Sequence, residues 1–232
     1  MPSPIVTATA QSALLAATSN VLAQVITSYQ AETPLVVDWV PIFQFVVYAF
    51  LNIPPNFLWQ EFLEATFPAT HISPTREAIA SASKGSEKEL EEEAAEGKLV
   101  EPRLNKGNTA IKLVLDQTIG AAVNTFLFSL FIHGIQATMP RPFGTALSAP
   151  EESGRYLSAL LSGAVKTGKV DWGVVVQQST EEFWPIMQAG WKLWPFVSLV
   201  NFAFIKSIEG RNLVGSLAGV VWGIYMSMIS AR

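Results

Sequence analysis

The chain has 232 residues, of which 50% are hydrophobic and only 15% are charged, and its mean hydropathy is +0.31. A soluble domain has about a quarter of its residues charged, so this composition indicates a membrane protein. Cysteine is absent, which excludes disulfides, thiol nucleophiles and cysteine metal sites. The net charge of −4 and the scattered basic residues provide no basic patch for nucleic acid.

Two apolar stretches in the first quarter of the chain predict membrane helices. Residues 1–31 carry no charge, and an apolar segment rich in Ser, Thr, Asn and Gln runs from about 12 to 30. A second, aromatic segment covers about 39–60 and contains Pro41, Pro54 and Pro55. Proline removes a backbone donor and is tolerated in membrane helices, so we expect a kink or a helix end near Pro54.

The composition inverts over residues 71–106, where Ser, Ala, Lys and Glu dominate and the run EKELEEEAAEGK lies at the centre. This segment has no apolar face that a core could bury. We therefore predict a polar mobile loop, with a docking site as the alternative.

The second half of the chain alternates apolar and polar segments. An apolar block at about 112–138 is long enough to span a bilayer, and a second loop is expected over 140–171, with a short helix around 156–165. Two further helices are expected from Trp172 to about Ile205, the first of them amphipathic around Glu181 and Glu182.

The last predicted helix is the clearest spanning segment, because residues 212–231 carry no charged side chain and about 20 residues cross a bilayer. Gly215, Gly219 and Gly223 recur every four residues, which permits close helix packing within the chain or in a homo-oligomer. We predict an all-α, multi-pass integral membrane helical bundle, one domain over 1–232. It would have about four transmembrane helices plus one or two amphipathic helices, and four spans against five stays open.

Polar residues inside the apolar segments are the candidate working parts, because such groups in a bilayer face a partner or a water-filled cavity. Asp116 lies four residues after Lys112, a spacing that favours an ion pair over a pore-lining role. For the others, interhelical hydrogen bonds compete with a place along a pore. The set comprises Asn20, Gln24, Asp116, Gln117, Asn124 and Asn201.

Arg211 lies in a polar break between two apolar helices. It could reach the lipid headgroups, cap the carbonyls of the preceding helix or pair with Glu209. We expect it to be a structural anchor at the membrane interface, where tryptophan side chains also settle.

Nothing in the chain predicts an enzyme. His71 and His133 are the only histidines, and no metal-binding, nucleophile or phosphate-loop motif occurs. We expect no catalytic residues, no metal site and no cofactor.

The C-terminal residues 191–230 resemble the signature of the 22-kDa peroxisomal membrane protein family, which includes the Mpv-seventeen-type proteins of the mitochondrial inner membrane. That signature is W-x-x-W-P, N-F, an Arg and W-x-x-Y-L-S, matched by Trp191, Trp194, Pro195, Asn201, Phe202, Arg211, Trp222, Tyr225 and Ser227. Upstream, Asp116 and Gln117 are similar to a family D-Q pair. Ser198 stands where the family often has Gln.

The resemblance implies a multi-pass protein of the peroxisomal membrane, with the mitochondrial inner membrane as the second location. It also implies a passive pore, or part of one, for small metabolites whose identity the sequence does not give. The alternative is a structural membrane protein that sorts or tethers organelle contents without transport. Membrane lipid is the expected partner.

Overall fold

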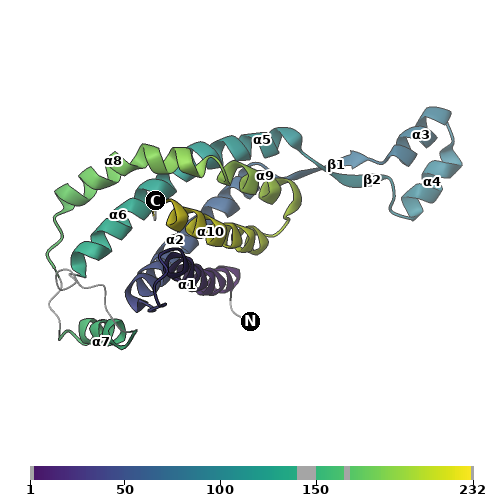
Figure 1. Ribbon diagram of the computed structural model, residues 1–232. Helices are drawn as coiled ribbons and strands as arrows, with labels where there is room; N and C mark the ends of the chain where they lie inside the picture. The colour runs from purple at the N-terminus through teal and green to yellow at the C-terminus, as the bar shows by residue number, and fades with distance from the viewer. Residues whose placement is uncertain (1–2, 140–149, 165–167, 231–232) are drawn as a thin grey trace.

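The computed structural model describes residues 3–139, 150–164 and 168–230, with side chains described as far as Tyr225. Apart from one two-stranded sheet, the secondary structure of these residues is helical, which confirms the predicted all-α fold class (Figure 1). The helices lie lengthwise against one another and leave one polar arm outside the bundle.

Among the described residues, three helical segments are long and apolar enough to cross a membrane. They are α1 (Pro4–Gln30), α2 (Trp39–Thr66) and the continuous segment Lys106–Thr138, with lengths of 27, 28 and 33 residues. The third segment comprises α5 (Lys106–Leu115), the π-helical turn η1 (Asp116–Gly120) and α6 (Ala121–Thr138). The predicted spans at 12–30, 39–60 and 112–138 each fall inside one of them.

Helix α2 begins where the Asp38 side chain accepts a hydrogen bond from the Val40 amide at 3.0 Å, a regular N-cap. It continues past Pro54 and Pro55 as far as Thr66, so the expected helix end near Pro54 is wrong. Each proline removes one donor from the helical ladder, and the strongly apolar turns on both sides keep the helix continuous.

The C-terminal third forms α8 (Trp172–Gly190), α9 (Trp194–Phe204) and α10 (Ile208–Ser230). Helix α9 is a shorter apolar helix, and α10 is not among the three spanning helices found in the described part. The first turns of α10 carry Glu209 and Arg211, and Ala231 lies outside the described residues. The fourth span therefore stays a prediction.

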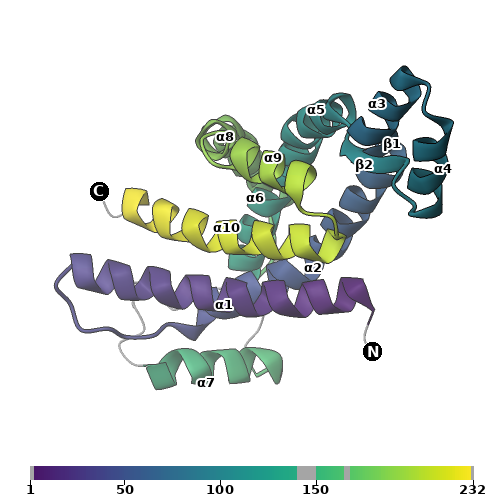
Figure 2. The ribbon, with the colours of Figure 1, turned by 90° about the vertical axis from the view of Figure 1, so that its right-hand side faces the viewer.

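Helix α1 packs against both α2 and α10, while α8 packs against α6 and α9 against α5. Figure 2 shows α1 and α10 running side by side. Helix α7 (Pro150–Leu161) packs on α2, where the Ser153 hydroxyl accepts a hydrogen bond from the Trp39 amide at 3.1 Å. It occupies part of the predicted loop 140–171 and begins earlier than the helix expected there. Residues 140–149 and 165–167 of that loop lie outside the described residues.

The predicted mobile loop 71–106 is instead an ordered arm that projects from the bundle (Figure 1). Strands β1 (Thr70–Pro74) and β2 (Val100–Leu104) pair antiparallel, from Thr70 opposite Leu104 to Pro74 opposite Val100. Helices α3 (Arg76–Lys84) and α4 (Glu87–Ala95) lie between the strands.

Local signals rather than an apolar core build this arm. The Thr75 hydroxyl caps α3 by accepting from the Ala78 amide at 3.1 Å, and Gly85 and Gly97 end the two helices with φ of +67° and +68°. The Ser81 hydroxyl donates to the Glu93 carboxylate at 2.9 Å and links α3 to α4. Helix α4 buries none of its residues.

Candidate functional site

A cavity of about 590 Å³ lies inside the bundle, between α1, α2, the η1–α6 segment, the end of α8 and α10. None of the described residues that line it is charged. Hydroxyl, amide and aromatic side chains share the wall with apolar ones. The polar members are Ser12, Ser19, Thr27, Tyr48, Asn52, Gln117, Asn124, Thr125 and Ser216.

Hydrogen bonds between helices fix part of this wall. The Tyr48 hydroxyl of α2 donates a hydrogen bond to the side-chain oxygen Oδ1 of Asn124, on α6, at 3.0 Å. The Ser12 and Ser216 hydroxyls, from α1 and α10, lie 2.6 Å apart. These two bonds tie α2 to α6 and α1 to α10 at the wall of the cavity.

The predicted polar residues separate into cavity-lining and structural groups. Gln117 and Asn124 line the cavity, whereas Asn20, Gln24, Asp116 and Asn201 are not among its lining residues. The Gln24 side chain donates to the Asp38 carbonyl at 2.8 Å and accepts from the Asp38 amide at 2.7 Å. It therefore fixes the loop between α1 and α2, and Asn20 accepts a hydrogen bond from it at 2.9 Å.

Asp116 is the centre of a polar network at the level of η1. Its Oδ1 accepts from Trp59 Nε1 and from Gln60 Nε2, both at 3.2 Å. Its Oδ2 accepts from Ser198 Oγ at 2.6 Å and from Gln117 Nε2 at 3.2 Å. The network joins α2, η1 and α9, so Asp116 acts as an interhelical acceptor.

The expected ion pair between Lys112 and Asp116 is wrong. Lys112 Nζ instead lies 2.7 Å from Glu64 Oε2, a residue of α2 that sequence reasoning missed. The π-helical turn begins at Asp116 and changes the angular spacing of the side chains after Leu115. Glu64 and Asp116 therefore accept hydrogen bonds from two separate sets of donors.

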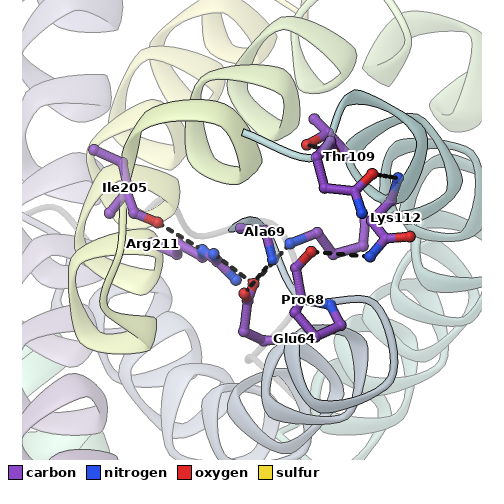
Figure 3. A network of polar contacts seen from close by, with 9 residues as sticks. Glu64, Pro68, Ala69, Thr109, Lys112, Ile205 and Arg211 are labelled. Atoms are coloured by element: carbon purple, nitrogen blue, oxygen red, sulfur yellow. Dashed lines mark hydrogen bonds and ion pairs between the residues drawn. The ribbon is translucent and has the colours of Figure 1, made fainter. Parts of the chain in front are cut away.

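Figure 3 shows the second set, a charged cluster formed by Glu64, Lys112 and Arg211. Arg211 Nη2 lies 2.7 Å from the same Glu64 Oε2, and the Ala69 amide donates to Oε1 at 2.7 Å. Lys112 is 0% exposed and Arg211 is 2% exposed. Both cations also lie over the Phe202 ring, at 5.2 and 5.5 Å from its centroid.

Arg211 therefore has one of its three expected roles. Its Nε donates to the Ile205 carbonyl at 3.0 Å, which caps the end of α9 as anticipated. Its burial contradicts a guanidinium at the lipid headgroups, and its carboxylate partner is Glu64 rather than Glu209. The Asn201 side chain donates to the Arg211 carbonyl at 3.2 Å and ties α9 to α10.

The remaining signature residues gather at the cavity and this cluster. Trp191, Trp194 and Trp222 line the cavity, and the Trp191 indole donates to the Gln117 carbonyl at 3.2 Å. Pro195 lies in the first turn of α9, and the Tyr225 ring lies 5.6 Å from that of Trp222. The side chain of Ser227 lies outside the described residues.

The three glycines of α10 have different surroundings. A Cβ added at Gly223 would lie 2.6 Å from the Ser19 hydroxyl of α1, so a side chain at this position would displace that hydroxyl. Nothing lies within 4 Å of a Cβ built at Gly215 or Gly219. Of these three glycines, only Gly223 makes a close contact with a neighbouring helix, while Gly219 and Gly223 also line the cavity.

Helices α6 and α8 are joined by a polar contact that the sequence did not reveal. Glu182 Oε2 lies 2.9 Å from His133 Nε2 and accepts from Ser129 Oγ at 3.1 Å. Among the described residues, no group of three His, Asp or Glu side chains comes together in a way that could hold a metal ion.

The C-terminal part of the chain, residues 166–227, matches the sequence model of the Mpv17 / PMP22 family. The chain is 41% identical over 51 residues to PXMP2/4 family protein 3 of Dictyostelium discoideum, which covers 22% of this chain and 27% of that protein.

Two fungal proteins named SYM1 are also similar. The one from Gibberella zeae is 27% identical over 84 residues, covering 36% of this chain and 43% of that protein. The one from Yarrowia lipolytica is 30% identical over 89 residues, covering 38% of this chain and 41% of that protein. The matches thus extend over less than half the length of each relative. No solved structure matches the chain.

Proposed function

We propose that this chain, whose residues 166–227 match the Mpv17 / PMP22 family, provides a passive pathway for small solutes across an organelle membrane. The observation that carries the proposal is the cavity of about 590 Å³ between helices of the bundle, in which three helices of the described part of the chain are long enough to span a membrane. A cavity of several hundred Å³ is large enough for a small metabolite.

The chemistry of the wall supports passage rather than tight binding. Its hydroxyl and amide groups, such as those of Ser19, Asn52 and Asn124, can replace part of the hydration shell of a polar solute. Because the described wall residues are uncharged, none of them holds an ionic ligand strongly. Weak contacts at several positions let a solute enter and leave.

Two glycines of α10 offer a matched test. Leucine at Gly219 would extend into the cavity, while leucine at Gly215 would not, and neither Cβ meets a neighbour within 4 Å. Purified wild type, Gly219→Leu and Gly215→Leu are reconstituted in liposomes, and glycerol entry is followed by light scattering. We expect entry to fall about tenfold in Gly219→Leu alone, because a blocked constriction stops conduction.

Two results would overturn this proposal. One is equal glycerol entry in Gly219→Leu and wild type, with both proteins folded by gel filtration in detergent. The other is tight liposomes around folded wild-type protein.

The location is proposed from the family resemblance. We propose the peroxisomal membrane, with the mitochondrial inner membrane as the alternative. A tagged full-length chain imaged with a marker for each organelle distinguishes them, and residence in the mitochondrion alone would overturn the peroxisomal proposal.

A structural role is the second candidate, and the bonding of the polar residues favours it. Asn20, Gln24, Asp116 and Asn201 all bond within the protein, as a purely organising bundle requires. The exposed arm with its acidic helix α4 would be the contact surface. Tight liposomes around folded protein would favour this function over the first.

A further inference from the structure

A second cavity, of about 620 Å³, lies between the first turns of α2 and the last turns of α6. Pro41 and Gln44 line it from α2, and Gln136 and Met139 from the α6 side. Like those of the first cavity, the described residues that line it are uncharged. The Gln44 amide donates to the Met139 sulfur at 3.7 Å, within the accepted range for sulfur.

The two cavities follow one another along the antiparallel helices α2 and α6. On α2 the second cavity takes residues 41–45 and the first takes residues 45–53. On the other segment the first takes residues 117–128 and the second takes residues 128–139. At about 1.5 Å per residue the stretch 117–139 covers about 33 Å, close to the thickness of a hydrocarbon core of about 30 Å.

Phe45 and Phe128 line both cavities. Their ring centroids lie 6.3 Å apart with an interplanar angle of 57°, which is contact distance for tilted aromatic rings. The Tyr48 ring meets Phe128 edge-on at 5.2 Å and supports it from the side of the first cavity. The two phenylalanines therefore form the partition between the cavities.

An apolar partition between two uncharged cavities discriminates by charge. Phenylalanine rings offer no hydrogen bond to replace hydration water, and a narrow apolar constriction empties of water. An ion there would lose its hydration with no opposite charge among the described residues of either wall, whereas a small neutral solute loses far less. Hydrogen-bonding side chains lie on both sides of the partition. Gln44 and Gln136 line the second cavity, and Tyr48 and Asn124 line the first.

We propose that Phe45 and Phe128 form the selectivity barrier of the pathway, which passes small uncharged hydrogen-bonding solutes and holds back inorganic ions. This inference rests on the proposed function, because it assumes that solutes move through the two cavities. It assigns the solute class to polyols and small amides, for which glycerol and urea are the probes.

The test compares glycerol entry and potassium release in liposomes that hold wild type, Phe45→Ala, Phe128→Ala or the double variant. Phe50→Ala is the matched control, because Phe50 lies on α2 and is 54% exposed on the outside of the bundle. We expect wild type and the control to admit glycerol and retain potassium. Potassium release should rise about tenfold or more in the double variant, because the dewetted constriction is lost. If the double variant does not fold, Phe45→Leu with Phe128→Leu preserves more side-chain volume and replaces it.

The outcomes separate the two proposals. Glycerol entry with equally fast potassium release in wild type would overturn the barrier while the pathway stands. Potassium retention by the folded double variant, with glycerol still entering, would do the same. Absence of glycerol entry in both folded wild type and the folded double variant would overturn the pathway itself, and the barrier with it.

Discussion

Glu64 Oε2 and Arg211 Nη2 lie 2.7 Å apart although the two residues are 147 positions apart in the chain. The same oxygen is 2.7 Å from Lys112 Nζ, so one carboxylate joins α2, α5 and α10. Two buried cations share a single anion, with the Phe202 ring beneath both. This carboxylate therefore links three helices that are far apart in the sequence.

Glu64→Gln is expected to lower the free energy of unfolding by about 3 kcal/mol, because it leaves two buried cations without their counter-charge. The measurement is the thermal midpoint of the detergent-solubilised protein, followed by gel filtration after heating. Glu61→Gln is the control, since Glu61 lies on the same helix and is exposed. Equal midpoints for the two variants would contradict the importance of the cluster.

Ser198→Ala tests the network around Asp116. The Ser198 hydroxyl makes the shortest contact with this carboxylate, at 2.6 Å, and its loss leaves Asp116 with three of its four donors. A lost hydrogen bond to a charged group costs about 1.5–3 kcal/mol. We expect the thermal midpoint to fall less than in Asp116→Ala, which removes the shared acceptor. The reverse order would show that Asp116 does not hold the network together.

Gly120→Ala is expected to destabilise the protein although alanine is the better helix former. A Cβ at Gly120 would lie 2.8 Å from Trp59 Nε1, so the indole must move and its hydrogen bond to Asp116 is lost. Gly215→Ala is the matched control, because its Cβ meets nothing within 4 Å and alanine there gains up to about 1 kcal/mol. Thermal midpoints should therefore shift in opposite directions, and a rise in both would contradict the crowding at Gly120.

The sequence predicts the helices well because hydrophobic length is a local property. Residues 12–30, 39–60 and 112–138 all lie within the three long apolar helices. The prediction of an ion-pair partner failed for Lys112, because its nearest carboxylate along the chain is Asp116 but its partner in space is Glu64. Partner choice depends on which distant helix approaches, and no spacing in the chain records that.

The candidate site was predicted only in part, because it too depends on which distant helices approach one another. Gln117 and Asn124 line the cavity, which agrees with the pore-lining alternative. Asp116 and Asn201 instead form hydrogen bonds to other helices. Phe45 and Phe128 drew no attention, because an aromatic residue in an apolar helix gives no local sign that it separates two cavities. In the arm, Thr75, Gly85 and Gly97 are local capping residues for α3 and α4, and the prediction of a loop overlooked them.

The arm itself provides the last prediction. Pro74 and Val100 are the final pair of the hairpin, so an Asn-Gly turn can connect them directly in place of residues 75–99. The strands remain, and so does the hydrogen bond from the Asn105 amide to the Ala69 carbonyl that anchors the start of α5. Because α3 and α4 pack on each other outside the bundle, the thermal midpoint should change by no more than about 2 °C.

The control for this shortened chain removes residues 70–104 entirely, which deletes the hairpin next to the Ala69–Asn105 contact and should destabilise α5. Glycerol entry into liposomes should be the same for the shortened chain and the wild type, because no residue of 75–99 lines either cavity. A large loss of stability in the shortened chain would mean that the arm supports the bundle. A loss of entry with stability intact would mean that the pathway extends through the arm.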